Sequence, residues 1–373
     1  MLRRHVLQAA AVGAAPWFAH AQEAGEIVVA HIGPFTVLPA PDAKELHEGA
    51  TAAIQVLNAK GGIGGRPLTL LRLDDTYTFD GFKARLAEAM QRKPLALLSP
   101  LGSATLKDLL DSKLLDQTDI TIVNAVPGAA VLRAPGHPKL FHIRAGDDQQ
   151  IRKILSHARA LSVTNMGVLH QDIPIGTSGL ASAQAAAQGL GMQIVGAGAN
   201  TDLPQITQAA QTIAKSNPQA AMVVGSPRFM GQSIAALRAA GMSQQLFTLS
   251  YLPAPALKAL AGVGARGVGI AQTYPNPNGV ASPLQRGFRQ AMQQGHPTLK
   301  DFTPFHLEGY VSVQVLAEGL RRAKALTPAG LAEGLRRMGE LDLGGFRVDF
   351  GRGNEGSQWV DIGVATAEGR LIY

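Results

Sequence analysis

The chain has 373 residues and a mass of 39.1 kDa, which is long for one hydrophobic core because single cores stop growing at about 250–300 residues, so we expect two lobes. Hydrophobic residues make up 46% and charged residues 16%, the 42 Gly and 22 Pro follow no period, and Cys is absent, which excludes collagen, coiled coils, disordered chains, disulfide scaffolds and cysteine chemistry. The net charge of +7 could suit a nucleic acid, but an aromatic content of 5% and the lack of long basic runs argue against that partner.

The first predicted element is an export signal at residues 1–21. A basic start at Arg3 and Arg4 precedes an apolar stretch, and a small-x-small sequence ending at Ala21 predicts cleavage there. The apolar stretch, residues 6–19, is shorter than the roughly 20 residues that span a bilayer, so no membrane anchor is expected. We therefore expect a soluble periplasmic protein. The two arginines fit both the general secretory route and the twin-arginine route, and that choice stays open.

From residue 26 onward, short β-branched runs alternate with helical stretches. The predicted strands lie at 27–33, 68–75, 94–100, 120–125, 140–144, 166–171, 193–199, 220–226, 246–250 and 267–272. The predicted helices lie at 43–62, 79–91, 105–117, 254–261, 304–323 and 328–338. This alternation predicts parallel sheets with helices on both faces, and the strands are too many for one compact sheet. The sequence thus predicts an α/β protein of two doubly wound lobes, and its tail, 345–373, predicts two strands around a Gly-rich turn.

Motifs of nucleotide-binding and hydrolytic enzymes are missing or misplaced. The segment 262–267 matches G-x-G-x-x-G, but it follows a predicted helix and precedes a strand, whereas the dinucleotide fingerprint needs the reverse order. No Walker A loop, G-x-S-x-G elbow or H-E-x-x-H helix occurs in the sequence. His137 and His142 are the only closely spaced histidines, and loop positions suit them better than a metal site. No cofactor is therefore expected.

Asp74 and Asp75 end the second predicted strand. The pair could supply acid and base in an exported enzyme, together with His170. Alternatively, the two carboxylates could cap the turn and helix that follow near Tyr77. Capping is the preferred interpretation, because nothing in the spacing of these residues indicates catalysis.

Longer segments resemble the leucine/isoleucine/valine-binding family of periplasmic ABC-transporter receptors. The segments are AKELHEGATAAIQVLNAKGGIGGRPLTLLRLDD (43–75), LLSPLGSAT (97–105), FHIRAGDDQQ (141–150), GVLHQDIPIG (167–176), MGQSIAALRAAG (230–241), ARGVGIAQTYP (265–275) and HLEGYVSVQVLAEGLRRA (306–323). No single segment is highly specific. Their joint order covers essentially the whole chain after the export signal, and that order carries the resemblance.

The resemblance implies a type I periplasmic binding protein, whose two lobes close on a small ligand like a hinged clamp and deliver it to a membrane permease. It implies no catalytic residues and a monomer. Three crossings between the lobes are expected near residues 145, 273 and 355. Lobe one would comprise 26–145 plus 274–355, and lobe two 146–273 plus 356–373.

The resemblance also locates a carboxylate site. In this family a serine just after the third strand and the amides of the following helix start hold the ligand carboxylate, which corresponds to Ser103 with Gly102, Ala104 and Thr105. Unsatisfied N–H groups and the positive end of a helix dipole suit an anion, and glycine allows close approach. The alternative is that Ser103 only caps the helix, and both roles can coexist.

Two neighbouring family positions depart from the usual pattern. The segment 124–130 holds no Ser or Thr, and Pro127 lacks an N–H, so a second hydrogen bond to the carboxylate would come from the amide of Gly128, Ala129 or Ala130, or would be absent. Ile175 stands where an aromatic residue is usual and would form an aliphatic wall instead.

Aromatic side chains near other strand ends are candidate walls for the ligand. They are Phe35, Tyr77 and Tyr251. Each could equally pack within its own lobe, and that alternative stays open.

The ammonium group of an amino-acid ligand has no obvious partner in this chain. Amino-acid-binding members meet it with an acid after the strand at 246–250, but no Asp or Glu occurs between Asp202 and Asp301. Burying an ammonium without a counter-charge is costly. Asp172 is the nearest candidate, with turn capping as its alternative. We therefore expect a small organic carboxylate ahead of a free α-amino acid.

The sequence thus predicts an extracytoplasmic solute-binding protein of a branched-chain-amino-acid-type ABC importer. Its partners would be a small-molecule carboxylate or amino acid and an inner-membrane ABC permease. A ligand-sensing receptor component is the first alternative, although such proteins usually carry a transmembrane segment. An exported enzyme on the same scaffold is the second.

Overall fold

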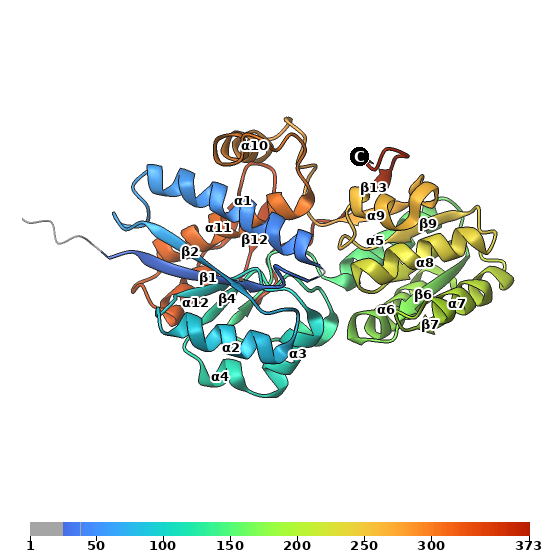
Figure 1. Cartoon of the computed structure of the whole chain (residues 1–373), viewed down its shortest axis with the longest axis horizontal. Coiled ribbons are helices and arrows are strands. Elements are labelled where there is room, and N and C mark those ends of the chain that lie inside the picture. Colours follow the sequence, from blue (N-terminus) through green and yellow to red (C-terminus); the bar gives the residue numbers. More distant parts are fainter. Residues whose placement is uncertain (1–24, 38) are drawn as a thin grey trace, which may run out of the picture.

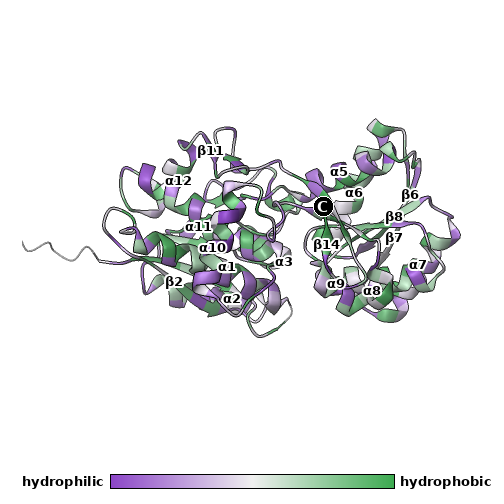
Figure 2. Ribbon diagram, turned by 90° about the horizontal axis from the view of Figure 1, so that it is seen from above, coloured by the Kyte–Doolittle hydropathy of each residue, from purple (hydrophilic) through white to green (hydrophobic). Residues whose placement is uncertain are grey.

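The computed structural model describes residues 25–37 and 39–373, so the predicted export signal lies outside the described residues. The chain forms two lobes, each built on its own sheet (Figure 1). Seen from above, the lobes are joined only by a few segments of chain (Figure 2). The predicted α/β class is confirmed.

The first lobe is built on a parallel sheet in the order β2-β1-β3-β4-β5. Its strands are β1 (Ile27–Gly33), β2 (Leu68–Asp74), β3 (Ala96–Leu98), β4 (Thr121–Val123) and β5 (Leu140–Phe141). Its helices are α1 (Ala40–Ala59), α2 (Phe79–Met90), α3 (Ser103–Asp111), α4 (Leu114–Gln117), α10 (Pro283–Gly295), α11 (Pro304–Arg322) and α12 (Pro328–Arg336), with a 3-10 turn at Ala130–Leu132 and a hairpin of β11 (Glu340–Asp342) and β12 (Arg347–Asp349). Successive residues of β1 face opposite sides, so Val29 and Ala30 enter separate hydrophobic cores on the two faces of the sheet.

The second lobe is built on a seven-stranded sheet in the order β14-β13-β10-β9-β8-β6-β7. Its parallel strands are β6 (Asn165–Gln171), β7 (Gln193–Ala199), β8 (Ala220–Val224), β9 (Gln245–Thr248) and β10 (Gly269–Gln272), with β13 (Asp361–Ala365) and β14 (Leu371–Ile372) added in antiparallel order. Its helices are α5 (Asp147–Ala160), α6 (Pro174–Leu190), α7 (Leu203–Lys215), α8 (Pro227–Ala239) and α9 (Ala254–Ala261), followed by a 3-10 turn at Gly262–Ala265. The G-x-G-x-x-G match therefore follows a helix and precedes a strand, as the sequence predicted, and this is the reverse of the dinucleotide-binding order.

Helix α11 is buried along most of its length and packs closely on α1. Two glycines allow this contact. A Cβ atom on Gly49 would collide with the carbonyl oxygen of His306, and one on Gly309 would collide with that of Leu46. The close approach fixes α11 behind the first sheet, from where it reaches the strand ends that form the site.

The chain passes between the lobes three times. The passages lie between β5 and α5, between β10 and α10, and between β12 and β13. The first and third are joined by a bridge between His142 and Glu355, and Arg133 contacts the carboxylate of Glu355 at 2.9 Å. The exact residues at which one lobe ends and the other begins stay a prediction.

Two predicted elements are wrong in detail. The predicted helix 105–117 begins at Ser103 and is broken into α3 and α4, because Lys113 takes a left-handed conformation with φ 55°. The tail does not form one pair of strands around a turn. β12 pairs with β11 in the first lobe, whereas β13 pairs with β10 and β14 in the second.

Candidate functional site

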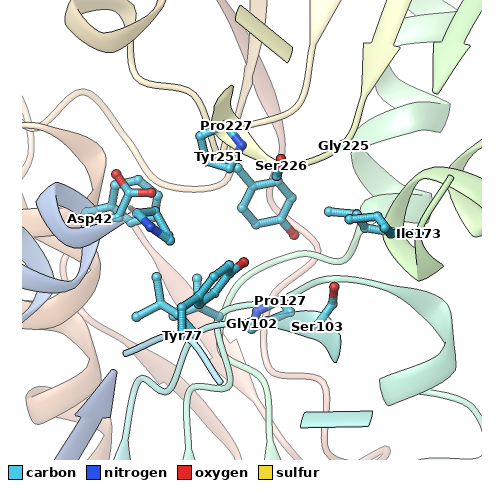
Figure 3. A pocket seen from close by; sticks show the side chains of 15 residues that line it. Asp42, Tyr77, Gly102, Ser103, Pro127, Ile173, Gly225, Ser226, Pro227 and Tyr251 are labelled. Carbon is cyan, nitrogen blue, oxygen red and sulfur yellow. The ribbon is translucent and has the colours of Figure 1, made fainter. Parts of the chain in front are cut away.

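A pocket lies between the two lobes, at the carboxyl ends of their parallel strands. Its lining comes from the segments after β1, β2, β3 and β4 in the first lobe and after β6, β8 and β9 in the second, with Phe305 of α11 added (Figure 3). Even with its open part counted, the space is about 490 Å³, so a ligand enclosed there in this conformation would have to be small. Ligands of doubly wound sheets bind at such strand ends.

The structure brings half of the predicted site residues to this pocket. Those that line it are Tyr77, Gly102, Ser103, Ile175 and Tyr251. Those that do not are Ala104, Thr105, Gly128, Ala129 and Asp172. Their roles in ligand binding stay predictions.

The start of α3 meets the pocket with free backbone donors. The N-cap position is Gly102, with φ 93°, and no side chain caps the helix. The first N–H groups of a helix lack intrahelical partners, so those of Ser103 and its neighbours are open to a ligand. Glycine is needed at 102, since a Cβ there would lie 3.1 Å from both Tyr77 Cε2 and Thr105 Oγ1. The alternative that Ser103 serves as the N-cap is wrong.

The loop after β2 is held by its two carboxylates. Asp74 Oδ1 accepts the N–H groups of Phe35 and Thr76 at 3.0 Å, and Asp75 Oδ1 accepts that of Tyr77 at 2.8 Å. Capping of the turn by Asp74 and Asp75 is thus confirmed, whereas capping of the helix by them is wrong, because Thr78 is its N-cap and accepts the N–H of Gly81 at 3.0 Å. Burial raises the pKa of Asp75 to about 6. These bonds hold Tyr77 with φ 58°, a strained conformation that directs its side chain to the pocket (Figure 3).

The loops after β3 and β4 are held from behind by α11. Ser99 and Asn124 both have positive φ, 52° and 61°. Asn124 Nδ2 donates to Ser99 Oγ at 3.3 Å and to Glu308 Oε1 at 3.0 Å, and Ser99 Oγ donates to Ser312 Oγ at 3.2 Å. Side chains of α11 therefore stabilise backbone conformations that would otherwise be costly.

A buried ion pair lies at the first passage between the lobes. Arg144 and Glu308 are each 1% exposed, and Arg144 Nη1 lies 3.0 Å from Glu308 Oε2. Burial acts to lower the pKa of Arg144, but Glu308 and, to a smaller extent, Tyr251, Tyr274 and Asp147 together outweigh it and hold that pKa above its usual range. The same guanidinium donates to Ser250 and lies 4.8 Å from the centre of the Tyr251 ring, so it joins both lobes.

Tyr251 uses its hydroxyl group between the lobes. The hydroxyl accepts the N–H of Gly128 at 2.7 Å and donates to Asp147 Oδ1 at 2.6 Å. Burial raises the pKa of Tyr251 above its usual range and that of Asp147 to about 6. The Gly128 amide is therefore already bonded and is not free for a ligand carboxylate in this conformation.

The second lobe contributes apolar side chains and a backbone turn. Ile173 and Ile175 lie at the start of α6, and Gly225, Ser226 and Pro227 lie at the start of α8 (Figure 3). The turn is held by the side chain of Gln171, whose Oε1 accepts the N–H of Ser226 at 2.8 Å.

Asp172 lies beside this wall and not in it. Its carboxylate lies 3.5 Å from His170 Nδ1, and 47% of the side chain is exposed. The residue is therefore poorly placed to meet a group of a ligand in the pocket.

Sequence reasoning missed Asp42, which lines the pocket from the first turn of α1. It is 7% exposed. Burial, with a contribution from Glu45, raises its pKa well above the usual range. Asp42 is the last residue of the predicted loop, directly before the helix expected to start at residue 43, so no helical periodicity marked it.

The described residues show neither a metal cluster nor a membrane helix. Across residues 25–37 and 39–373, no group of three or more His, Asp or Glu side chains could hold a metal ion. In the same part of the chain, no helix is long and apolar enough to cross a bilayer.

Comparisons with known proteins agree with this geometry. The family model of the periplasmic binding protein matches residues 26–368. The crystal structure of an extracellular ligand-binding receptor from Verminephrobacter eiseniae is 45% identical, with 93% of this chain and 100% of that chain covered and a TM-score of 0.89. A substrate-binding periplasmic protein from Ralstonia solanacearum is 26% identical over 93% of this chain and 99% of that chain, with a TM-score of 0.84.

A third structure carries the name of the resembled family. It is a possible leucine/isoleucine/valine-binding protein from Rhodopirellula baltica, 20% identical over 94% of this chain and 97% of that chain, with a TM-score of 0.84. The search of curated proteins found no match. These similarities confirm the type I fold that the resemblance implied.

Proposed function

The chain belongs to the periplasmic binding protein family, and from this membership we propose that it is the extracytoplasmic solute-binding protein of an ABC importer of the branched-chain amino acid type. It captures a small carboxylate-bearing ligand between its lobes and passes it to a permease in the inner membrane. It acts as a monomer and catalyses no reaction.

The open start of α3 carries this proposal. Ser103 and the free N–H groups beside it face a pocket whose walls come from both lobes. The N-termini of α6 and α8 also meet the pocket, through Ile173 and Ser226. Helix N-termini carry partial positive charge, so their convergence on one small pocket favours an anionic group in the ligand.

The connection between the lobes supports capture by closure. Three passages of chain join the lobes, and the ion pair of Arg144 with Glu308 lies beside the pocket at one of them. A rotation about these passages changes the distance between Ser103 and the α8 turn without disturbing either sheet. Hinge closure around a ligand is a common transition in proteins of this architecture.

Replacement of Ser103 by Ala tests the site. The change removes one hydrogen bond to the ligand carboxylate, and a bond to a charged group contributes about 1.5–3 kcal/mol, so affinity should fall at least tenfold. The ligand is first identified by mass spectrometry of small molecules released on heating the purified protein, or by thermal shift with a panel of organic acids. Isothermal titration then gives the affinity. An unchanged affinity in Ser103→Ala would remove this residue from the site.

A ligand-sensing receptor component is the second candidate. The same pocket and hinge would serve it, and only the partner differs. Uptake of labelled ligand by cells with and without the gene separates the two, since loss of uptake supports import. Turnover of the bound molecule during incubation would instead support an enzyme.

A further inference from the structure

One largely buried carboxyl group lines the pocket. Asp42 is 7% exposed and lines the cavity, and among the residues that the structure describes no hydrogen bond or ion pair reaches its side chain. Buried polar groups are bonded in most proteins, and an unbonded one is costly. A ligand group is the natural partner for such a side chain.

The charges around Asp42 favour a cation over a second anion. Among the described residues that line the pocket there is no Lys, Arg or His, and Asp42 is the one acid. The ionisable groups around it are Glu45 on the same helix and, from other elements, Glu308 of α11, Arg144 and the phenol of Tyr77. Arg144 is the single positive group among these, and it is already engaged by Glu308.

The two polar ends of the pocket lie apart. Asp42 and Ser103 stand on opposite sides of it, with Tyr77 between them (Figure 3). The starts of α3 and α6 meet at the Ser103 side, through Ser103 and Ile173 (Figure 3). One end of the cavity is thus suited to an anion, and the other end presents an acid.

We propose that Asp42 binds a cationic group of the ligand, so that the pocket selects organic acids whose ammonium group is separated from the carboxylate by several bonds. The inference rests on the proposed function, because the carboxylate is taken to occupy the Ser103 end. An ammonium adjacent to that carboxylate would lie near Ser103, where the second lobe presents Ile173 and where the neighbouring Asp172 does not line the pocket. The first lobe therefore supplies both charge contacts.

Matched pairs of organic acids test this selection. The pairs are 4-aminobutyrate with butyrate, 5-aminovalerate with valerate, and 4-(aminomethyl)benzoate with 4-methylbenzoate. Leucine and valine are tested beside them as α-amino acids. Binding is measured by thermal shift and titration calorimetry on the wild type, on Asp42→Asn and on the control Asp172→Asn. In the wild type we expect at least one aminated member to bind at least tenfold more tightly than its matched acid. This preference should vanish in Asp42→Asn and persist in the control Asp172→Asn.

The outcomes separate this inference from the proposed function. Three outcomes would overturn the role of Asp42 and leave the carboxylate site intact. They are equal binding of both members of each pair, a preference for the aminated member that persists in Asp42→Asn, and tighter binding of leucine and valine than of the aminated acids. If none of the aminated acids, their matched acids, leucine or valine binds, both the role of Asp42 and the carboxylate site are overturned. Asn has nearly the shape of a protonated Asp, so binding of the acids without an amine reports that the variant is folded.

Proton release gives a second readout. Burial raises the pKa of the unbound carboxyl well above the usual range and so favours its protonated form, whereas a bound cation favours the ionised form. Calorimetry in two buffers of different ionisation enthalpy should show release of a proton when an aminated acid binds to the wild type. Release that is as large in Asp42→Asn would contradict the assignment.

Discussion

The two walls of the pocket differ in what they offer a ligand. The wall of the first lobe carries an acid, a phenol and an uncapped helix start, at Asp42, Tyr77 and Ser103. The wall of the second lobe carries two isoleucines and a short turn, with the hydroxyl of Tyr251 already bonded between the lobes. The polar recognition groups are therefore concentrated on one side.

The two walls also differ in how they are held. Tyr77, Ser99 and Asn124 all have positive φ in the first-lobe loops, and side chains of α11 or neighbouring carboxylates bond to each loop. In the second lobe the described non-glycine residues with positive φ are Ser162 and Asn217, and neither lines the pocket. The binding surface of the first lobe is therefore preorganised, whereas the second lobe mainly covers the ligand.

Removal of the buried charge behind the first wall should have the largest effect. Arg144→Met leaves Glu308 buried without its partner, which costs about 3–5 kcal/mol of unfolding free energy. Denaturant unfolding followed by circular dichroism measures this loss. The double variant with Glu308→Gln removes both charges and should recover part of it. A double variant less stable than Arg144→Met would show that the unpaired charge is not the cause.

Acid should weaken the first lobe through a buried histidine on β1. Burial, with a smaller contribution from His47, lowers the pKa of His31 to about 3. Below about pH 6.5 His31 is protonated in the unfolded chain but stays neutral in the folded chain. The free energy of unfolding therefore falls as pH falls from 6.5 toward 3, and this group accounts for a loss of about 2 kcal/mol at pH 5. The neighbouring His47, with a pKa lowered to about 4, acts in the same direction.

The variant His31→Gln isolates this contribution. Asp75 and Asp147, whose pKa values are raised to about 6, act in the opposite direction, because their folded forms gain protons as pH falls. Their contribution is the same in both proteins. The loss of unfolding free energy between pH 7 and pH 5 should therefore be smaller by about 2 kcal/mol in His31→Gln than in the wild type. Equal losses would mean that His31 is protonated in the folded state.

The smallest effect is expected on the second wall. Ser226 is the N-cap residue of α8 but forms no side-chain capping bond, so Ser226→Ala should change stability little. The affinity of the Ser226→Ala variant for the ligand should change less than twofold, whereas that of Ser103→Ala should fall at least tenfold. Titration calorimetry on both variants makes the comparison. Similar losses in the two would show that both lobes share the recognition of the carboxylate.

Strong periodic signals made the first lobe and the strand ends predictable. The strand IVVAHIG was found exactly where its apolar run lies, 27–33, and glycine at 61 and 62 ended the next helix near its true end at Ala59. Helices α5, α6, α7, α8 and α10 were not assigned. In α6 the buried face is made of small residues such as Gly179 and Ala183, which contrast little with the polar face, so the 3.6-residue period is faint.

The site was predictable only in part, for a different physical reason. The family resemblance implied Ser103, and Tyr77 lies soon after the end of β2, where the rule that parallel strands end at one edge places it in the pocket. Asp42 lies nine residues after the end of β1, and whether such a residue turns inward depends on the path of the intervening loop. The use of the Gly128 amide by Tyr251 depends on how the two lobes meet, which local sequence patterns do not encode.

A crystal structure with bound ligand tests the central claim most directly. The protein is crystallised with the organic acid that gives the largest thermal shift. We predict that the ligand lies between the lobes, with its carboxylate within hydrogen-bond distance of the Ser103 hydroxyl and the first N–H groups of α3, and with the second lobe contributing apolar contact. A carboxylate bound instead at the α8 turn of the second lobe, or a ligand outside this pocket, would contradict the account.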